Sequence, residues 1–268
     1  MQKIRKVIIP VAGFGTRFLP ATKAQPKEML PIIDKPIVQY VVEEAVASGI
    51  TDIILVTGAS KRAVEDHFDY NYELQQWLKK QGKETLRQEM KHIADMANFI
   101  YIRQKGPYGN GTPVLCAREV VGDEPFVVLW GDEFIYSAPP RTKQCIEVFQ
   151  KYGDPVISGI RVPKQDVSKY GIAEAVPIEK NVHQISSLIE KPEPKETSSN
   201  LAAHGCYVLT PDIFASIEAA GPRALGEIQL TDGLRHLLAS RPIYGYRFEG
   251  KRYDTGDKLG FLIATVEF

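Results

Sequence analysis

The chain has few cysteines, no excess charge of either sign and no long apolar run. Its three cysteines, Cys116, Cys145 and Cys206, are odd in number and widely spaced, and they form no CxxC pair. A disulfide framework and a zinc knuckle are therefore not supported, and a reducing cytoplasm is the expected compartment. Lys plus Arg and Asp plus Glu number 33 each, so the formal net charge is zero. We therefore expect neither nucleic acid nor a membrane surface as a partner.

The first apolar run, residues 7–11, is too short for the core of a signal peptide. No stretch approaches the ~18 apolar residues that a membrane-spanning helix needs. Apolar residues make up 44% and charged residues 25% of the 268 positions, which is typical of globular proteins. We therefore expect a folded globular chain with a substantial core.

Short apolar segments alternate with amphipathic ones up to about residue 155. Strands are predicted at 6–11, 53–56, 99–102 and 126–129. Helices are predicted at 36–49, 61–68, 72–97 with a break near Gly82, 114–120 and 142–152. This alternation is typical of an α/β fold, with a Rossmann-like, mostly parallel central sheet and helices on both faces.

The pattern changes after residue 156. Shorter strands are predicted at 156–160, 172–175, 185–189 and 206–209, with a hydrophilic stretch at 191–200. Helices at 212–220 and 231–239, a strand at 243–248 and a helix from Lys258 follow. No linker is long enough to separate two independent domains. We therefore predict one domain, 1–268, made of an N-terminal region, residues 1–155, and a smaller, β-rich C-terminal region, residues 156–268.

The strongest functional signal is the glycine-rich loop after the first strand. It reads Gly13-x-Gly15-Thr16-Arg17-x-x-Pro20 and is followed by Pro26-Lys27. Glycines there let backbone N–H groups approach an anion closely. Phe18 replaces the third glycine of a Rossmann fingerprint, and the Gly-Lys-Ser/Thr of a P-loop is missing. Arg17 can bind a polyphosphate with two hydrogen bonds and Lys27 can bind a second phosphate, whereas a tight turn with solvated cations is the alternative.

Two aspartates are candidate metal ligands. Asp132 follows the strand at 126–129, and ligands of open parallel sheets bind beyond the carboxyl ends of the strands. A carboxylate there can hold Mg²⁺ against phosphate oxygens. Asp254 can supply a second carboxylate, because Asp257 is better placed to cap the terminal helix. A turn or cap role is the alternative for both candidates.

Other polar residues give weaker signals. In Glu190-Lys191, the carboxylate suits sugar hydroxyls and the ammonium suits a phosphate, with a solvated turn as the alternative. Lys169-Tyr170-Gly171 is a similar, weaker candidate. The histidines at 67, 92, 183, 204 and 236 form no ligand-spaced pair, and we interpret each as a surface or core residue. The motifs of serine and cysteine nucleophiles are missing. Cations, carboxylates and backbone amides suit phosphoryl-type transfer.

These motifs together resemble the bacterial UTP–glucose-1-phosphate uridylyltransferases, a branch of the sugar nucleotidyltransferases. The resemblance runs from Val7 to about Val266. It is carried by residues 12–31, 34–36, 39–43, 60–61, 121–125, 169–171, 190–192, 199–202, 227–232 and 257–260. The glycine-rich loop with Pro26-Lys27 implies only a sugar nucleotidyltransferase. The longer matches at 26–30 and 227–232 point to the uridylyltransferase branch.

The resemblance implies a nucleotidyltransferase fold in which the N-terminal region binds the nucleotide and the C-terminal region binds the sugar. The implied nucleotide-binding residues are Ala12, Gly13, Gly15, Thr16, Gln104 and Gly109, of which Gln104 and Gly109 contact uracil. The implied catalytic residues are Arg17, Lys27 and Asp132. The implied Mg²⁺ ligands are Asp132 and Asp254. The implied sugar-phosphate residues are Gly171 and Glu190, for glucose hydroxyls, and Lys191, for the phosphate.

The implied reaction joins UTP and α-D-glucose 1-phosphate into UDP-glucose and diphosphate without a covalent enzyme intermediate. The implied enzyme is a cytoplasmic homo-oligomer, a dimer or a tetramer. A transferase for dTTP or another sugar 1-phosphate, and a non-catalytic sugar-nucleotide-binding regulator, are the alternatives. The chain departs from the family at Trp130-Gly131, at Thr112-Pro113, and at His204 and Cys206, where an aliphatic residue and an arginine are more usual. These departures bear on nucleobase and sugar preference.

Overall fold

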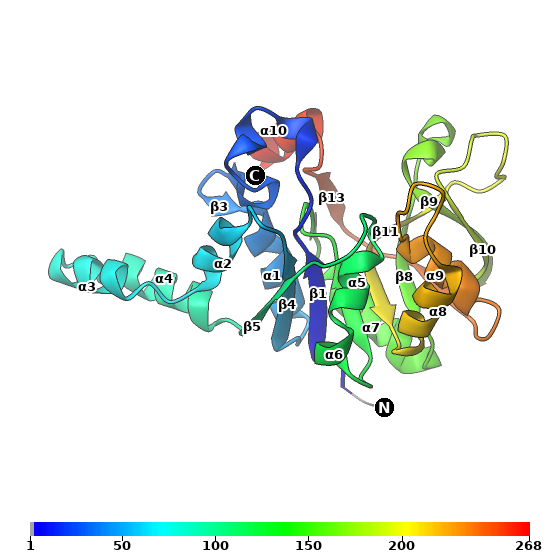
Figure 1. The fold of residues 1–268 in the computed structure, drawn as a ribbon, viewed down its shortest axis with the longest axis horizontal. Coiled ribbons are helices and arrows are strands. Elements are labelled where there is room, and N and C mark those ends of the chain that lie inside the picture. Colours follow the sequence, from blue (N-terminus) through cyan, green and yellow to red (C-terminus); the bar gives the residue numbers. More distant parts are fainter. Residues whose placement is uncertain (1–2) are drawn as a thin grey trace.

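The computed structural model describes residues 3–268 and is built around a nine-stranded sheet (Figure 1). Its strands are β1 (Lys6–Pro10), β4 (Asp52–Thr57), β5 (Asn98–Arg103), β6 (Phe126–Leu129), β8 (Val156–Arg161), β9 (Gly171–Glu179), β10 (Val182–Glu190), β11 (Leu201–Leu209) and β12 (Tyr244–Arg247). The order across the sheet is β5-β4-β1-β6-β11-β8-β12-β10-β9. Strands of the N-terminal and C-terminal regions thus share one sheet, while residues 1 and 2 of the predicted domain lie outside the described residues.

Most strands of this sheet run in one direction, and β10 and β11 run against the others. β5, β4, β1 and β6 pair in parallel, as the alternation of strands and helices predicts. Beyond β6 the sheet is mixed, because β11 runs antiparallel to both β6 and β8, and β10 runs antiparallel to β9 and β12. Only Lys180 and Asn181 separate β9 from β10, and so short a turn forces an antiparallel hairpin. The remaining strands share one direction, as predicted for a mostly parallel sheet.

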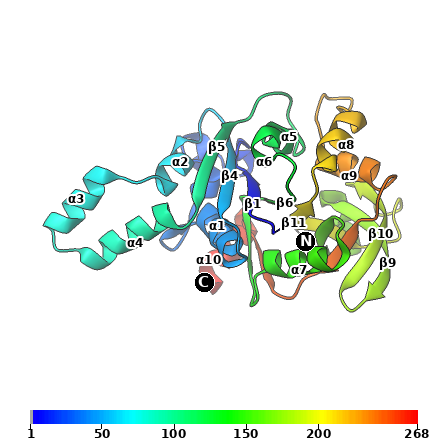
Figure 2. The ribbon, with the colours of Figure 1, turned by 90° about the horizontal axis from the view of Figure 1, so that it is seen from below.

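Helices cover both faces of the sheet, as predicted. They are α1 (Ile37–Ala47), α2 (Arg62–Phe68), α3 (Tyr72–Lys80), α4 (Glu84–Asp95), α5 (Thr112–Cys116), α6 (Arg118–Val121), α7 (Arg141–Tyr152), α8 (Asp212–Ala220), α9 (Leu230–Leu237) and α10 (Lys258–Glu267). Figure 2 shows α1 and α7 on one side of the sheet and α5, α6 and α8 on the other. Alternation along β1 explains this arrangement, because Val7 and Ile9 pack with Val41 of α1, whereas Ile8 packs with Val114 of α5.

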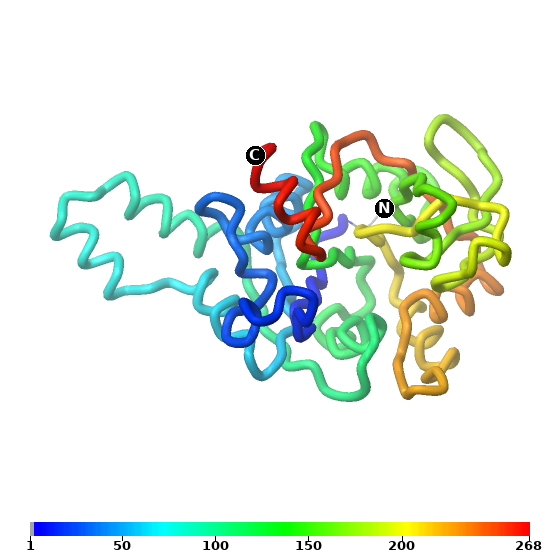
Figure 3. The backbone as a smooth tube through the Cα atoms, turned by 90° about the horizontal axis from the view of Figure 1, so that it is seen from above, coloured from blue at the N-terminus to red at the C-terminus, as the bar shows by residue number. Residues whose placement is uncertain are grey.

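The predicted break in the segment 72–97 is confirmed, since Gly82 separates α3 from α4 with φ +67°. These two helices form an arm that projects from the body of the molecule (Figures 1 and 3). The helix predicted at 114–120 is divided into α5 and α6 at Ala117. Within residues 3–268, no helix combines the length and apolar character needed to cross a membrane.

Two small sheets and several short helical turns were not predicted from the sequence. β7 (Glu133–Tyr136) and β13 (Lys251–Asp254) pair antiparallel, with Asp254 opposite Glu133. β2 (Pro31–Ile32) and β3 (Lys35–Pro36) form a second pair. The 3₁₀ turns are η1 (Thr16–Phe18), η2 (Ala21–Lys23), η3 (Lys27–Met29) and η4 (Lys164–Lys169). The β7–β13 pair matters most for function, because it brings Asp254 next to the end of β6.

Candidate active site

A cavity of about 400 Å³ lies beyond the carboxyl ends of β6 and β10. Its wall contains many of the predicted site residues, namely Arg17, Gly109, Asp132, Gly171, Glu190, Lys191 and Asp254. They come from segments that are far apart in the sequence. This position agrees with the general rule that open α/β sheets bind ligands at the carboxyl ends of their strands.

The glycine-rich loop and Lys27 form one packed unit. Gly15 has φ +67°, a backbone conformation that favours glycine, and its carbonyl accepts a hydrogen bond of 2.7 Å from Thr22 Oγ1. A Cβ at Gly15 would lie 3.1 Å from Cβ of Lys27, and one at Gly13 would lie 3.9 Å from Cε of Lys27. The two glycines therefore allow η3 to pack against the loop and to hold the Lys27 side chain beside its backbone.

Ala12 and Gln104, two predicted nucleotide-binding residues that do not line the cavity, follow the ends of β1 and β5. The Ala12 carbonyl is 3.3 Å from the position that a Cβ on Gly58 would take. Gln104 continues the parallel pairing of β5, since its N–H donates to the Thr57 carbonyl at 2.9 Å. Gly109 packs on the backbone of Ile228, where a Cβ would come within 2.1 Å of the Ile228 oxygen. The structure therefore brings both glycine-rich loops to the same edge of the sheet.

Lys27 and Asp132 form an ion pair. Burial acts to lower the pKa of Lys27, but the Asp132 carboxylate reverses this effect and leaves the pKa above its ordinary value. Burial acts to raise the pKa of Asp132, and the Lys27 ammonium reverses that effect in turn, so this pKa lies below its ordinary value. Both side chains are therefore charged at neutral pH.

The two predicted metal ligands border one small space. Thr255 Oγ1 donates to the Asp132 carbonyl at 2.6 Å, and the Gly256 N–H donates to Asp254 Oδ1 at 3.0 Å. A Cβ on Gly256 would lie 3.1 Å from Asp254 Oδ1 and 3.4 Å from Asp132 Oδ2. No cluster of three or more Asp, Glu, His or Cys side chains suited to a metal occurs within residues 3–268. Two carboxylates with room for other oxygen ligands fit a divalent ion that keeps water or phosphate oxygens.

Glu190 is held in place, whereas the side chain of Lys191 is largely exposed. Thr231 Oγ1 donates to Glu190 Oε2 at 2.7 Å, and a Cβ on Gly171 would lie 3.1 Å from that same oxygen. The Lys191 N–H is fixed by the Tyr170 carbonyl at 2.9 Å, and its side chain is 61% exposed, with the ammonium 4.0 Å from Glu190 Oε1. A fixed carboxylate and an exposed ammonium suit hydroxyl recognition and phosphate capture respectively.

Three further polar residues of the cavity wall, Glu133, His204 and Arg252, were not found from the sequence. His204 is buried and hydrogen-bonded to Glu133, in agreement with the predicted core role, and it also lines the cavity. The sequence did carry one signal, namely a histidine where the family usually has an aliphatic residue. Glu133 directly follows the predicted ligand Asp132, but its place in the cavity wall, like that of Arg252, depends on the β7–β13 pair, which was not predicted.

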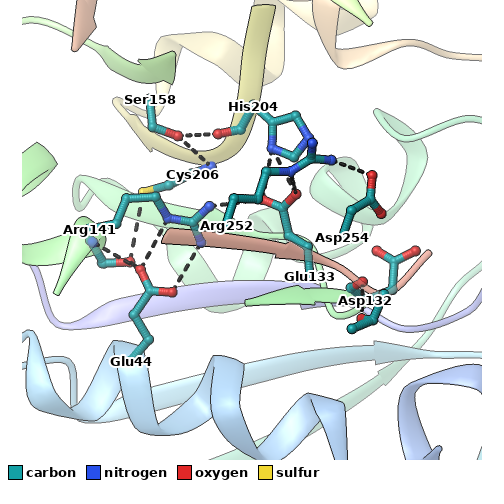
Figure 4. A network of polar contacts seen from close by, with 11 residues as sticks. Glu44, Asp132, Glu133, Arg141, Ser158, His204, Cys206, Arg252 and Asp254 are labelled. Atoms are coloured by element: carbon teal, nitrogen blue, oxygen red, sulfur yellow. Dashed lines mark hydrogen bonds and ion pairs between the residues drawn. The ribbon is translucent and has the colours of Figure 1, made fainter. Parts of the chain in front are cut away.

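A buried arginine supports these residues from below. Arg141 donates to Glu44 at 3.1 and 3.2 Å and to Glu133 Oε1 at 2.8 Å. Burial acts to lower the pKa of Arg141, but Glu44 and Glu133 outweigh it and raise the pKa further. Figure 4 shows how this network runs from Glu44 to the side of the cavity where Asp132 and Asp254 lie. The floor of the cavity is therefore tied to α1 and α7.

Known proteins share both the sequence and the fold of this chain. The sequence profile of the family described as "Nucleotidyl transferase" matches residues 6–267. The chain belongs to the nucleotidyl transferase family. A UTP–glucose-1-phosphate uridylyltransferase of Bacillus subtilis (strain 168) is 50% identical over 268 residues, which cover 100% of this chain and 92% of that protein.

Solved structures of this nucleotidyl transferase family agree with that result. A UDP-glucose pyrophosphorylase complexed with UDP-glucose matches with TM-score 0.90 and 40% identity, covering 99% of this chain and 98% of its own. A UTP-bound enzyme from Acinetobacter baumannii matches with TM-score 0.91 and 37% identity, covering 99% and 93%. The predicted resemblance and the predicted fold class are thereby confirmed. Nucleotidyl transferases of this type typically use a divalent metal ion.

Proposed function

We propose that the chain transfers the uridylyl group of UTP to α-D-glucose 1-phosphate, giving UDP-glucose and diphosphate. The observation that carries this proposal is the 50% identity to a UTP–glucose-1-phosphate uridylyltransferase over the whole chain. The cavity supports it, because its wall carries cations suited to phosphates, carboxylates suited to a metal ion, and the Glu190 carboxylate, which suits sugar hydroxyls. The new bond joins a phosphate oxygen of glucose 1-phosphate to the α-phosphorus of UTP, and the bond from that phosphorus to diphosphate breaks.

The chain's own cations would bring the two anionic substrates together. Arg17 would bind the β- and γ-phosphates with Gly15 and Thr16, while Lys27 would bridge the phosphates around the reacting phosphorus. Lys27 supports this role, because its ion pair with Asp132 places the ammonium beside the glycine-rich loop. The attacking phosphate oxygen is already anionic near neutral pH, so positioning and charge neutralisation replace a general base.

Asp132 and Asp254 would hold Mg²⁺. The ion would supply charge neutralisation for phosphate oxygens when bound. Asp132 forms an ion pair with Lys27, and Asp254 forms one with Arg252. The two aspartates would therefore exchange a side-chain cation for the metal.

The remaining residues divide between the two ends of the substrate pair. Ala12 and Gly13 would contact the uridine through their backbone, and Gln104 and Gly109 would contact uracil. Gly171 and Glu190 would bind glucose hydroxyls, and Lys191 would bind the sugar phosphate. We accordingly assign the nucleotide to the N-terminal region and the sugar to the C-terminal region of a single domain.

Release of diphosphate tests the proposed reaction. The purified chain with Mg²⁺ and UTP is expected to release diphosphate only when glucose 1-phosphate is added. Intact UTP binding without release would support a sugar-nucleotide-binding regulator instead. Faster release with dTTP or with another sugar 1-phosphate would support a related transferase.

We propose that the protein acts in the cytoplasm as a homo-oligomer, a dimer or a tetramer. Its three cysteines are free thiols, which suits a reducing compartment. One face of α10 exposes four apolar side chains, those of Leu259, Leu262, Ile263 and Val266. A stripe of this kind on a surface helix suits contact with a second copy. Light scattering in solution gives the number of copies, and a monomer at all concentrations would contradict the proposal.

A further inference from the structure

The polar cluster Glu133, His204 and Arg252 lines the cavity but has no role in the reaction proposed above. Its members come from β7, β11 and β13, so long-range pairing rather than a local motif brings them together. Gly205 has φ +75°, and a Cβ there would lie 1.6 Å from Glu133 Oε1. The bulge in β11 thus makes room for the Glu133 carboxylate directly beneath His204.

The contacts of His204 fix which of its ring nitrogens carries the proton. Nδ1 lies 2.9 Å from Oε1 and 2.7 Å from Oε2 of Glu133. The Glu133 carboxylate forms an ion pair with Arg141 at 2.8 Å, and a carboxylate only accepts hydrogen bonds, so Nδ1 is the donor. Burial, with the nearby cations Arg252 and Arg141, lowers the pKa of His204 to about 3, so the ring is neutral. Nε2 is consequently a hydrogen-bond acceptor, and it has no such partner within residues 3–268.

Arg252 leaves a donor free on the same side of the cavity. Its Nε lies 3.4 Å from Glu133 Oε2, and its Nη2 binds Asp254. Its Nη1 makes no hydrogen bond within 3.5 Å among the described residues, while Tyr170 interacts with the guanidinium and helps to raise its pKa. The guanidinium carbon lies 5.6 Å from the centre of the Tyr170 ring, and the His204 ring lies 5.4 Å from the same ring. The free acceptor and the free donor therefore both border the Tyr170 ring.

We propose that His204 Nε2 and Arg252 Nη1 bind one ring hydroxyl of the sugar 1-phosphate, which makes His204 a specificity-determining residue. A hydroxyl donates one hydrogen bond and accepts others, so it matches one acceptor and one donor. The inference rests on the proposed function, in which Gly171 and Glu190 bind other hydroxyls of the same sugar. Because Glu133 and His204 are buried and Arg252 contacts Glu133, a sugar without this hydroxyl leaves both groups unpaired, and the expected penalty is about 10–100-fold in kcat/KM.

Substitution of His204 tests the proposal through its effect on substrate discrimination. In His204→Asn, the shorter amide can still donate to Glu133 but places no acceptor at Nε2. We measure kcat/KM for glucose 1-phosphate and for its four monodeoxy analogues, each lacking one hydroxyl. In the parent chain, one analogue is expected to lose about 10–100-fold through this contact. In His204→Asn, the kcat/KM for that analogue is expected to become nearly equal to the kcat/KM for glucose 1-phosphate. The other three analogues are expected to keep the ratios to glucose 1-phosphate that they have in the parent chain.

His204→Gln is the rescue variant, because its longer amide reaches the place of Nε2 and is expected to restore some of the discrimination. His236→Asn, an exposed histidine on α9, is the matched control and keeps every ratio. If His204→Asn does not fold, Arg252→Lys keeps the charge and removes Nη1. This variant is expected to remove the same difference in kcat/KM between glucose 1-phosphate and that analogue.

If His204→Asn and Arg252→Lys each lower kcat/KM by the same factor for glucose 1-phosphate and for all four analogues, the inference is overturned. A merely structural role would lower every rate together in this way. The KM for UTP serves as a second readout and is expected to stay unchanged. If the parent chain does not turn over glucose 1-phosphate at all, the proposed function itself fails. Turnover with unchanged ratios in the variants would remove only the role of His204.

Discussion

The two ends of the cavity hold their charges in different ways. At the phosphate end, the side chains of Lys27, Asp132 and Asp254 are 22%, 27% and 35% exposed. At the sugar end, those of Glu133 and Arg141 are 5% and 0% exposed. The first group belongs to loops and strand ends, whereas the second is anchored to α1 and α7 through Glu44.

This difference suits two kinds of recognition. Partly exposed ions keep access to water, so they can exchange one partner for another at little cost as substrates and metal arrive. A buried ion cannot exchange its partner, because a charge left alone in the interior is strongly destabilising. We infer that the phosphate end adapts to changing charge during the reaction, whereas the sugar end keeps one shape and selects among hydroxyl patterns.

Asp132→Asn is expected to give the largest effect and tests the phosphate end. The neutral amide holds a divalent ion poorly and no longer balances Lys27, so kcat/KM should fall by about 10³-fold or more. The fold should persist, because Asp132 lies in a partly exposed turn. Diphosphate release and circular dichroism measure the two outcomes, with Asp95→Asn on α4 as the matched control. Near-parental rates in Asp132→Asn would remove this residue from the metal site.

Arg141→Met tests the sugar end through stability. Glu44 and Glu133 would both lose their buried partner, so the free energy of unfolding should fall by about 3 kcal/mol or more. Arg118→Met is the matched control, because its ion pair with Glu218 is 47% and 54% exposed and should contribute less than about 1 kcal/mol. Urea unfolding compares the two variants. Equal losses would mean that burial does not distinguish the two kinds of ion pair.

The same contrast explains what could be predicted from the sequence. Asp132 and Lys27 follow recognisable local patterns, a strand end and a glycine-rich loop, so residue type and spacing were enough to find them. β1 and α1 carry clear apolar periodicities and were also predicted. These features depend on neighbours in the sequence.

The features that were missed depend on long-range pairing. Residues 133–136 and 251–254 are short strands of four residues, and only their pairing with each other makes them a sheet. Arg252 and the contacts of Glu133 with it therefore could not be predicted. The antiparallel direction of β11 likewise follows from its entry between β6 and β8, which no local pattern records.

The stability of the sugar end in acid gives a third, smaller expected effect. His204 has a pKa of about 3 in the folded chain and an ordinary value of 6.5 when unfolded. As pH falls below 6.5, the unfolded state binds the proton first, so the free energy of unfolding decreases by up to about 1.4 kcal/mol per pH unit. This stability is fully present above pH 6.5 and is lost on acidification. Between pH 6.5 and 5, the parent chain should lose about 2 kcal/mol more than His204→Asn, as measured by urea unfolding. Parallel pH profiles would contradict a neutral, buried His204.

Asp257→Ala is expected to give the smallest effect. It tests whether the position of Asp254 at the phosphate end depends on the capped start of α10. Asp257 caps α10 by accepting the Gly260 N–H at 2.9 Å, as predicted, and loss of this cap should cost about 1 kcal/mol. Gly260 packs on the Asp254 backbone, where a Cβ would lie 1.9 Å from the carbonyl oxygen. Mg²⁺ affinity measured by calorimetry should therefore weaken by up to about fivefold, while the ratios among sugar analogues stay unchanged. Asp257→Asn retains a capping oxygen and should behave like the parent chain. If both variants weakened Mg²⁺ binding equally, the carboxylate charge rather than the cap would position Asp254, and the phosphate end would owe less to helix α10 than its packing indicates.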